Sequence, residues 1–262
     1  MDGSRIILAA HRGDKFRYPE NTALAFQAAI DLGVDMIETD IHMTRDGELV
    51  IIHDRSAKRT TGVDRFIDEM TLAEVKELDA GCMFEPKMPS KILTVREFIE
   101  LIKDTDMLVN WELKTYPKYI GHERAFEAAD KLIALIEEYG MEKRSMLNSF
   151  SAQVLEHIYK KYGKKYPIHG QGINNCRKSC DTAEVDEREL FDWCCMYANV
   201  KGKLAIEFRE NFDYCLENGV IPCVCMPDTI EGYKIAIDYG CKMFTSNNIS
   251  EADKVLRALG VR

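Results

Sequence analysis

The chain has 262 residues, of which 46% are hydrophobic and 30% are charged, and its formal net charge is −9. This composition is typical of a soluble globular protein, and the length suits one large α/β barrel, which typically runs to about 250 residues. The acidic balance argues against a nucleic-acid partner, but it permits an anionic ligand at a site that carries a metal or a few basic side chains.

Short apolar runs rich in β-forming residues alternate with helical patterns along most of the chain. The predicted strands are Ile6–Ala10, Met36–Asp40, Met107–Leu113, Ser145–Phe150, Tyr166–Gly170, Trp193–Ala198, Ile221–Cys225 and Lys242–Thr245. The predicted helices are Thr22–Leu32, Val95–Lys103, Glu123–Tyr139, Ala152–Tyr162, Val185–Phe191, Ala205–Asn218, Ile230–Tyr239 and Glu251–Leu259. Parallel strands need crossover connections, and these helices supply them, so the pattern predicts a (β/α)8 TIM barrel. A doubly wound open sheet is the alternative, but no glycine-rich fingerprint follows the first strand.

The alternation breaks after Asp40, where the Asp-Gly pair at positions 46–47 is a strong hairpin signal. The connection is too short for a helical crossover, so the strand Leu49–His53 is expected to return antiparallel and to end near the second strand. The next residues, about 54–92, are predicted to form an insertion with one short helix at Leu72–Leu78. We therefore expect a single domain that spans residues 1–262 and carries one small insertion after its second strand.

The nine cysteines are an odd number for a disulfide framework, and the N-terminus has no secretory pattern. No run approaches the roughly 18 apolar residues of a membrane span, so we expect no stable membrane insertion. Free thiols without a leader indicate a cytoplasmic location. Zinc at Cys176-x3-Cys180 or at Cys223-x-Cys225 is an alternative use of the thiols, but the spacing and the partners fit it poorly.

Chemically active side chains gather where the first three parallel strands end and where the hairpin returns. They are His11, Arg12, Glu38, Asp40, His53, Glu112 and Lys114. The C-terminal ends of barrel strands line one active-site mouth, so we expect these side chains to meet there. The other histidines that we considered are interpreted as surface or core residues: His42, His122 and His157.

Three carboxylates at one mouth would repel one another at pH 7 unless protons or a cation bind them. Oxygen ligands without thiols favour one divalent cation such as Mg²⁺ or Ca²⁺, with Mn²⁺ as a further option, over zinc. The guanidinium of Arg12 and the ammonium of Lys114 suit phosphate oxygens, and histidines exchange protons near neutral pH. The set therefore predicts a phosphoryl-transfer site.

The motifs of the first 55 residues extend this interpretation. They are Ala10-His11-Arg12-Gly13, Pro19-Glu20-Asn21-Thr22, Gly33-Val34-Asp35, Ile37-Glu38-Thr39-Asp40, Thr44-Arg45-Asp46-Gly47 and His53-Asp54. Two later motifs are Arg59-Thr60-Thr61-Gly62 and Trp111-Glu112-Leu113-Lys114. Together they resemble the glycerophosphodiester phosphodiesterase family of bacterial type, whose barrel is similar to that of phospholipase C-like phosphodiesterases.

The resemblance implies a (β/α)8 barrel with an insertion after the second strand, and a reaction that hydrolyses a glycerophosphodiester to glycerol 3-phosphate and an alcohol. It also implies site roles. Glu38, Asp40 and Glu112 would bind the metal, His11 and His53 would act as acid and base, and Arg12 and Lys114 would hold the phosphate. We expect Glu20 and Asn21 to support the site. The expected partner is a small glycerophosphodiester, and the sequence carries no signal for an oligomeric state.

The resemblance weakens toward the C-terminus. The family's Trp-Thr-Val-Asn stretch reads Cys225-Met226-Pro227-Asp228, its Thr-Asp pair reads Thr245-Ser246, and its Ile-Pro-Thr-Leu stretch reads Ile92-Leu93-Thr94-Val95. These positions bear on the choice of substrate. A lysophospholipase D or a sphingomyelinase D-like phosphodiesterase on the same barrel is therefore an alternative, and it would use an apolar rim formed by Met83, Phe84, Met88 and Ile92. A non-catalytic barrel that binds phosphodiesters is a further alternative.

Overall fold

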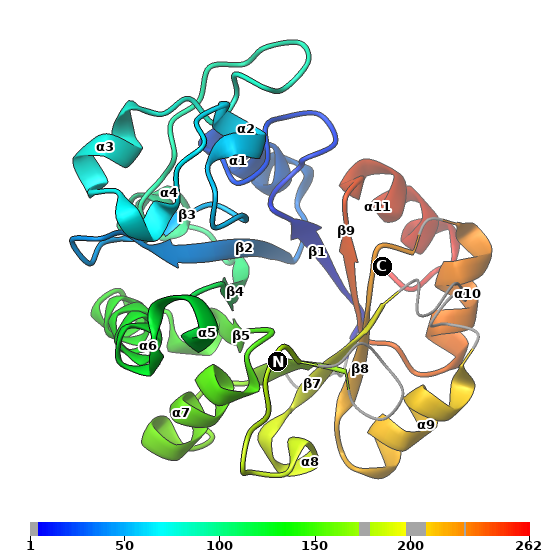
Figure 1. Cartoon of the computed structure of the whole chain (residues 1–262). Helices are drawn as coiled ribbons and strands as arrows, with labels where there is room; N and C mark the ends of the chain where they lie inside the picture. The colour runs from blue at the N-terminus through cyan, green and yellow to red at the C-terminus, as the bar shows by residue number, and fades with distance from the viewer. Residues whose placement is uncertain (1–4, 173–178, 198–207, 228) are drawn as a thin grey trace.

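The computed structural model describes residues 5–172, 179–197, 208–227 and 229–262. Within these ranges eight parallel strands pair in the order β1-β9-β8-β7-β6-β5-β4-β2, and the β1–β2 pairing closes the ring (Figure 1). The strands are β1 (Ile7–His11), β2 (Met36–Met43), β4 (Leu108–Leu113), β5 (Ser145–Asn148), β6 (Ile168–Gln171), β7 (Trp193–Tyr197), β8 (Ile221–Cys225) and β9 (Met243–Ser246). The predicted (β/α)8 TIM barrel is confirmed.

Helices cover the outside of the ring, as expected for right-handed crossovers between parallel strands (Figure 1). The principal ones are α1 (Ala23–Leu32), α4 (Val95–Ile102), α6 (His122–Glu138), α7 (Ala152–Tyr162), α8 (Glu187–Leu190), α9 (Arg209–Glu217), α10 (Ile230–Asp238) and α11 (Ile249–Ala258), with the short α5 (Pro117–Ile120) before α6. The predicted helix Val185–Phe191 is shorter in the structure, and the predicted start of Ala205–Asn218 lies outside the described residues.

The barrel interior has two chemically distinct ends because alternate residues of each strand point inward. On β2 the inward positions run from Met36 through Glu38 to Asp40, from apolar to acidic. The apolar end is packed with side chains from several strands, including those of Met36, Met146, Trp193 and Met243. The strand ends are therefore where polar side chains can meet without disturbing the core.

The hairpin prediction is confirmed. The strand β3 (Leu49–Ile51) pairs antiparallel with β2, and Gly47 adopts the left-handed φ of 87° that the turn requires. The following segment contains the predicted helix as α3 (Leu72–Glu77), and also two pieces that were not predicted: α2 (Lys58–Thr61) and η1 (Ile67–Glu69). These pieces are too short to show a helical period in the sequence.

The inserted segment lies beside β2 and β3 and has a small hydrophobic core of its own (Figure 1). Ile67 and Val75 are fully buried in this core, and Ile92 is 1% exposed. The division of residues 1–262 into one domain with an insertion at about 54–92 stays a prediction.

Two features of the whole described chain bear on the earlier expectations. No helix in these ranges is long and apolar enough to cross a membrane. The eight cysteines within them form no disulfide bond. Cys176, from one of the two zinc alternatives, lies outside the described residues.

Candidate active site

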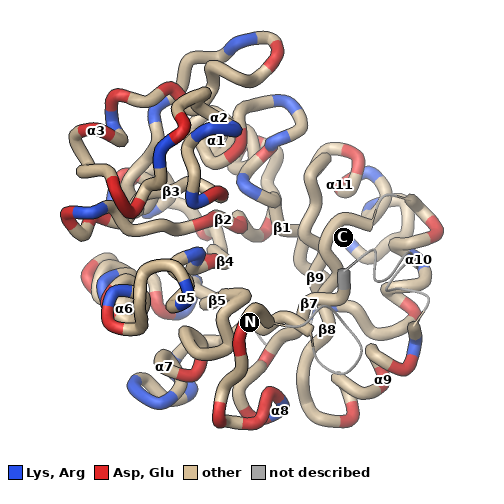
Figure 2. The backbone as a smooth tube through the Cα atoms, in the orientation of Figure 1, with Lys and Arg blue, Asp and Glu red and all other residues tan. Residues whose placement is uncertain are grey.

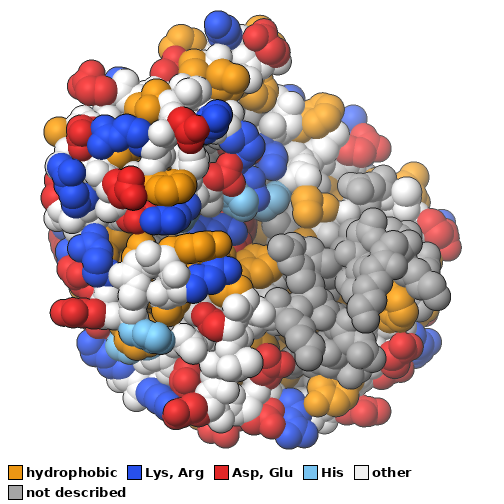
Figure 3. Space-filling view, viewed as in Figure 1, with side chains coloured by type: hydrophobic (Ala, Val, Ile, Leu, Met, Phe, Trp, Pro, Cys, Tyr) orange, Lys and Arg blue, Asp and Glu red, His pale blue; other side chains and the backbone are white. Residues whose placement is uncertain are grey.

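The strand ends of the barrel surround a cavity of about 780 Å³. Six of the seven clustered side chains predicted from the sequence line it, namely His11, Arg12, Glu38, His53, Glu112 and Lys114, and Asp40 is buried beside them. Figure 2 shows acidic positions on β2 and beside β4 near the centre of the ring. Figure 3 shows a histidine among charged side chains at the hollow in the same region. The structure therefore brings the predicted group together.

Three carboxylates form the most highly charged part of the cavity. Oxygens of Glu38, Asp40 and Glu112 all lie within 4.8 Å of one another, and each side chain is buried. Burial, and then the charges of Asp40 and Glu112, raise the pKa of Glu38 well above its ordinary value. The Oε1 atom of Glu38 is buried without a hydrogen-bond partner. An all-oxygen set with an unsatisfied carboxylate oxygen fits a hard divalent cation such as Mg²⁺ or Ca²⁺.

Two cationic side chains are paired with these carboxylates. Arg12 Nε lies 3.1 Å from Asp40 Oδ2, and Lys114 Nζ lies 3.3 Å from Asp40 Oδ1 and also pairs with Glu112. Burial would lower the pKa of Lys114, but Glu112 and Asp40 outweigh it and hold the pKa above its ordinary value. Burial would likewise raise the pKa of Asp40, but Lys114 and Arg12 hold it below its ordinary value.

Three carboxylates and two cationic side chains leave one formal negative charge in the group. A bound divalent cation would turn this into one positive charge. That balance suits a phosphodiester, which carries a single negative charge. The charge count therefore supports a site that needs a metal before it can accept an anion.

His11 ends β1 and is held in one orientation. Its Nδ1 lies 2.5 Å from Asn247 Oδ1, and because an amide oxygen only accepts, Nδ1 carries the proton. The other nitrogen, Nε2, then has its lone pair free and lies 3.8 Å from Glu38 Oε2. Burial, reinforced by the charges of Arg12 and Lys15, lowers the pKa of His11 to about 3. His11 is therefore neutral at pH 7, with Nε2 unprotonated.

His53 lies at the cavity on the returning segment of the hairpin and has a carboxylate partner. Its Nδ1 is 2.6 Å from Asp54 Oδ1, and Asp54 in turn pairs with Arg59. A carboxylate that accepts from Nδ1 fixes the orientation of the ring. The two histidines thus differ, since His11 contacts a neutral amide and His53 contacts a charged carboxylate.

The predicted supporting residues contact the charged group directly. Asn21 Nδ2 donates to Asp40 Oδ2 at 2.8 Å, and its Oδ1 accepts from Thr39. Glu20 accepts hydrogen bonds from Arg12 and from both terminal nitrogens of Arg59, Nη1 and Nη2. Arg12 and Asn21 have left-handed backbones, with φ of 61° and 58°. Such strain in non-glycine residues is typical of functional sites.

Several contributing residues were not predicted as site residues. Asn247 orients His11, and its position just after β9 could have revealed it, since that is another strand end at the same mouth. Arg59 links Glu20 to Asp54 and was quoted only as part of a motif. His42, to which we gave no role, is buried at the cavity wall, and its Nε2 lies 3.1 Å from the backbone oxygen of His53.

The positions that depart from the family pattern lie partly in the cavity. Cys225, Met226 and Thr245 line it, and Met226 has a left-handed φ of 58°. Ser246 is buried and accepts a hydrogen bond from the backbone of Asn248. Asp228 lies outside the described residues.

The expected apolar rim is corrected in part. Ile92 is 1% exposed because it belongs to the core of the insertion, so it cannot meet a lipid. Met83 is exposed, and Phe84 is partly exposed beside it. Other apolar side chains reach the active-site cavity instead, those of Phe66 and Tyr119, which are exposed and line it.

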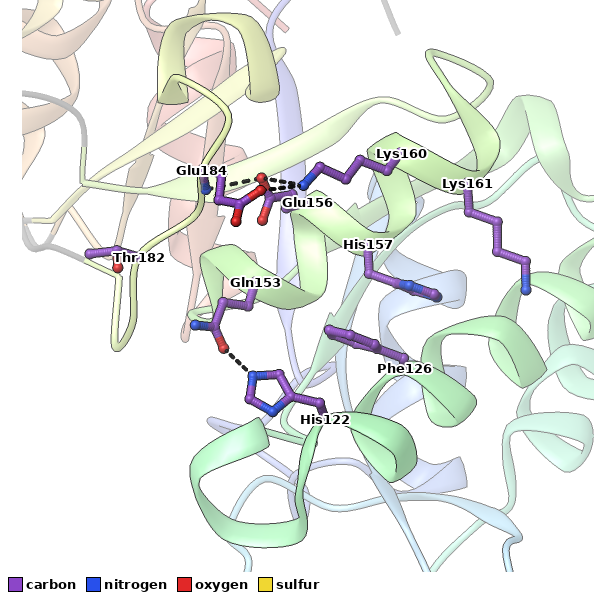
Figure 4. Close-up of a pocket in the computed structure, with 9 residues that line it drawn as sticks. All are labelled: His122, Phe126, Gln153, Glu156, His157, Lys160, Lys161, Thr182 and Glu184. Atoms are coloured by element: carbon purple, nitrogen blue, oxygen red, sulfur yellow. Dashed lines mark hydrogen bonds and ion pairs between the residues drawn. The ribbon is translucent and has the colours of Figure 1, made fainter.

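A second hollow lies away from the strand ends, between α6, α7 and the loop that holds Glu184 (Figure 4). Several of its side chains contact one another. His122 contacts Gln153 at 3.0 Å, Lys160 bridges Glu156 and Glu184, and the ring of His157 stacks on Phe126. This arrangement is a hydrogen-bonded surface and carries no chemistry that we assign.

Comparison with solved structures supports the fold of the barrel. A glycerophosphoryl diester phosphodiesterase structure from Silicibacter pomeroyi superposes with a TM-score of 0.81 at 21% identity and covers 98% of this chain and 95% of its own. A phosphodiesterase from Oleispira antarctica, solved in complex with the product sn-glycerol-3-phosphate, superposes with a TM-score of 0.79 at 21% identity and covers 96% of each chain. At these identities the likeness establishes the fold.

Sequence comparison gives the family. The profile of the glycerophosphoryl diester phosphodiesterase family matches residues 11–194, and the chain belongs to this family. A glycerophosphodiester phosphodiesterase from Caldanaerobacter subterraneus subsp. tengcongensis is 43% identical over 158 residues, which cover 60% of this chain. One from Bacillus altitudinis is 37% identical over 144 residues, which cover 54% of this chain. The matched segments span 63% and 56% of these relatives' lengths.

Because His42 is buried, it should make stability depend on pH. Burial lowers its pKa from 6.5 to about 4, so the folded protein favours the neutral ring. This contribution is present above pH 6.5 and is lost as the pH falls toward 4. The free energy of unfolding of the wild-type protein should fall between pH 7 and pH 5. In His42→Asn we expect this fall to be smaller by about 2 kcal/mol. Urea denaturation at the two pH values measures it, with His122→Asn as a surface control. Parallel pH profiles for wild type and His42→Asn would contradict the assignment.

Proposed function

We propose that this protein is a metal-dependent phosphodiesterase that hydrolyses glycerophosphodiesters to glycerol 3-phosphate and an alcohol. The observation that carries the proposal is the convergence of three carboxylates, two histidines and two cationic side chains on one cavity. The family membership supports it, and so does the product sn-glycerol-3-phosphate bound to the Oleispira antarctica neighbour.

In this proposal Glu38, Asp40 and Glu112 hold one divalent cation, either Mg²⁺ or Ca²⁺, with Mn²⁺ as a further option. When bound, the cation supplies a positive charge that neutralises phosphoryl oxygens. Arg12 and Lys114 add two cationic groups next to the carboxylates, so each can exchange a carboxylate partner for a phosphate oxygen. These groups act most strongly on the additional charge that develops in the transition state, which is where they accelerate the reaction.

The two histidines divide the proton transfers. His11, neutral and with Nε2 unprotonated, accepts the proton of the attacking hydroxyl group. His53, whose ring is oriented by Asp54, donates a proton to the departing alkoxide. The attacking group is either water or the glycerol hydroxyl of the substrate. In the second case the reaction would pass through a cyclic phosphate. Glu20 and Asn21 support the reaction by fixing Arg12 and Asp40. We place the protein in the cytoplasm, because the cysteines in the described part of the chain form no disulfide bond.

Removing either histidine should reduce turnover without unfolding the protein. We expect His11→Ala and His53→Ala each to lower kcat by about 10²–10⁴-fold, because general acid–base catalysis contributes that much. His122→Ala, on the far hollow, is the matched control and should retain full activity. Circular dichroism would confirm folding. Near-normal turnover in either active-site variant would refute its catalytic role.

A lipid-directed phosphodiesterase is the second candidate, because Phe66 and Tyr119 give the cavity an exposed apolar edge. An assay that identifies the reaction products distinguishes the two activities. Its substrates are glycerophosphocholine, glycerophosphoethanolamine and lysophosphatidylcholine. Glycerol 3-phosphate released from the first two substrates, with little turnover of the third, is the expected result. Preferred cleavage of lysophosphatidylcholine would favour the lipid-directed activity. Binding without any turnover would indicate a non-catalytic barrel.

A further inference from the structure

A group of sulfur and nitrogen atoms lies inside the barrel and has no part in the proposed reaction. We call it the thiol–imidazole cluster and define it as His169 on β6, Cys195 on β7, and Cys223 and Cys225 on β8. Donor atoms of His169, Cys195 and Cys223 all lie within 4.8 Å of one another. Cys223 Sγ is 3.2 Å from His169 Nε2, and Cys225 Sγ is 2.6 Å from Cys195 Sγ.

The barrel geometry explains how residues distant in sequence meet. Cys195 pairs with Cys223 in the register of the neighbouring strands, and Cys225 is two residues further along β8, so these three side chains point to the same interior face. His169 reaches them from β6. The cluster is well shielded, since His169, Cys195 and Cys223 are at most 1% exposed.

The cluster has access to the active-site cavity. His169 and Cys225 both line that cavity, whereas Cys195 and Cys223 lie deeper, next to the apolar side chains of the barrel interior. Cys225 is also close enough to Glu38 for the carboxylate to raise the pKa of the thiol, after larger effects from Cys195 and from burial. A small cation that enters the cavity could therefore reach either the carboxylates or the thiols.

The donor types decide which cation suits each place. Three thiols and one imidazole form a set that zinc adopts in proteins, whereas Mg²⁺ and Ca²⁺ prefer oxygen ligands. Ligand atoms around tetrahedral zinc lie about 3.5–3.8 Å apart, so binding would require the sulfur atoms of Cys195 and Cys225 to separate by about 1 Å. It would also require Cys225 Sγ to move toward the other donors, because it does not lie within 4.8 Å of all three of them. The carboxylates and the cluster are thus matched to different metals.

The partner of His169 supports a ligand role. Asn110 Nδ2 lies 3.0 Å from His169 Nδ1, and Asn110 Oδ1 is buried with no hydrogen-bond partner. Turning the amide by 180° would let Oδ1 accept a hydrogen bond from Nδ1–H, which leaves the lone pair of Nε2 directed at the cluster. A hydrogen-bond acceptor behind Nδ1 is typical of histidines that bind metals.

We propose that the thiol–imidazole cluster is a zinc site, separate from the carboxylate site and held by His169, Cys195, Cys223 and Cys225. Binding releases protons from the thiols, because only thiolates ligate zinc. The site joins β6, β7 and β8 beneath the active-site mouth, so an occupied site stabilises this side of the barrel against unfolding.

The test uses the full-length protein, reduced and stripped of metals, in an excess of Mg²⁺ that occupies the carboxylates. Titration with Zn²⁺ against a chromophoric chelator should show one tight equivalent. Replacement by Co²⁺ should give a sulfur-to-cobalt charge-transfer band in the near ultraviolet, which carboxylate ligands do not produce. Cys223→Ala and Cys195→Ala should weaken zinc binding by at least about 100-fold and reduce the band.

Two controls separate this site from the proposed catalytic one. Cys215→Ala removes a buried thiol on α9, outside the cluster, and should leave zinc affinity and the band unchanged. Glu112→Gln removes a carboxylate of the catalytic group and should likewise leave both unchanged. If the cysteine variants do not fold, the cobalt band of the wild-type protein decides the question by itself.

Three results would overturn the proposal. One is the absence of a tight zinc equivalent. Another is cobalt binding without the charge-transfer band, with affinity that falls in Glu112→Gln. The third is a Cys195–Cys225 disulfide that resists reduction and excludes the metal. None of these results bears on phosphodiester hydrolysis, which the substrate assay tests separately.

Discussion

The mutual repulsion of Glu38, Asp40 and Glu112 is the constraint on which the rest of the site depends. With carboxylate oxygens within 4.8 Å, each pair of charges costs on the order of 3 kcal/mol or more at an effective dielectric constant of about 20. Arg12 and Lys114 offset part of this cost, and a divalent cation would offset the remainder. The same shortage of positive charge would, in the proposed function, draw a divalent cation to the carboxylates, and the site would then carry the net positive charge that suits a phosphodiester.

The fold maintains this arrangement by placing strain and hydrogen bonds around it. Arg12 and Asn21 adopt left-handed backbones so that their side chains can reach Asp40. Gly13, next to Arg12, packs so tightly that an added Cβ would lie 2.6 Å from the backbone of Ala25 at the start of α1. Arg59 then ties the inserted segment to the loop after β1 through Glu20. The charged group is therefore fixed by contacts from both the barrel and the insertion.

The sequence predicted the barrel and the position of the charged group because both depend on local patterns. Alternating strands and helices have distinct periodicities, and strand ends meet at one mouth in any (β/α)8 barrel, which places Glu38 near Glu112. Contacts between distant strands have no such local pattern. Asn247 orients His11 from 236 positions away, and although its place after a strand end puts it at the mouth, no local pattern shows which side chain it contacts.

The thiol–imidazole cluster could not be predicted from the sequence either, because it also depends on contacts between distant strands. The spacing of Cys223 and Cys225 fits zinc poorly on its own, because the other two donors come from β6 and β7. The short elements of the insertion, α2 and η1, escaped prediction because a single turn has no period to detect. Prediction from sequence thus succeeded where one strand or one helix carries the signal, and failed where packing creates it.

Calorimetric titration of the metal-free protein with Mg²⁺ and Ca²⁺ tests the central claim most directly, because it measures the cation that the carboxylates are proposed to hold. The account predicts one saturable cation site in the wild-type protein and a large loss of affinity in Asp40→Asn, with folding retained. Absence of saturable binding, or equal affinity in the wild type and Asp40→Asn, would contradict it.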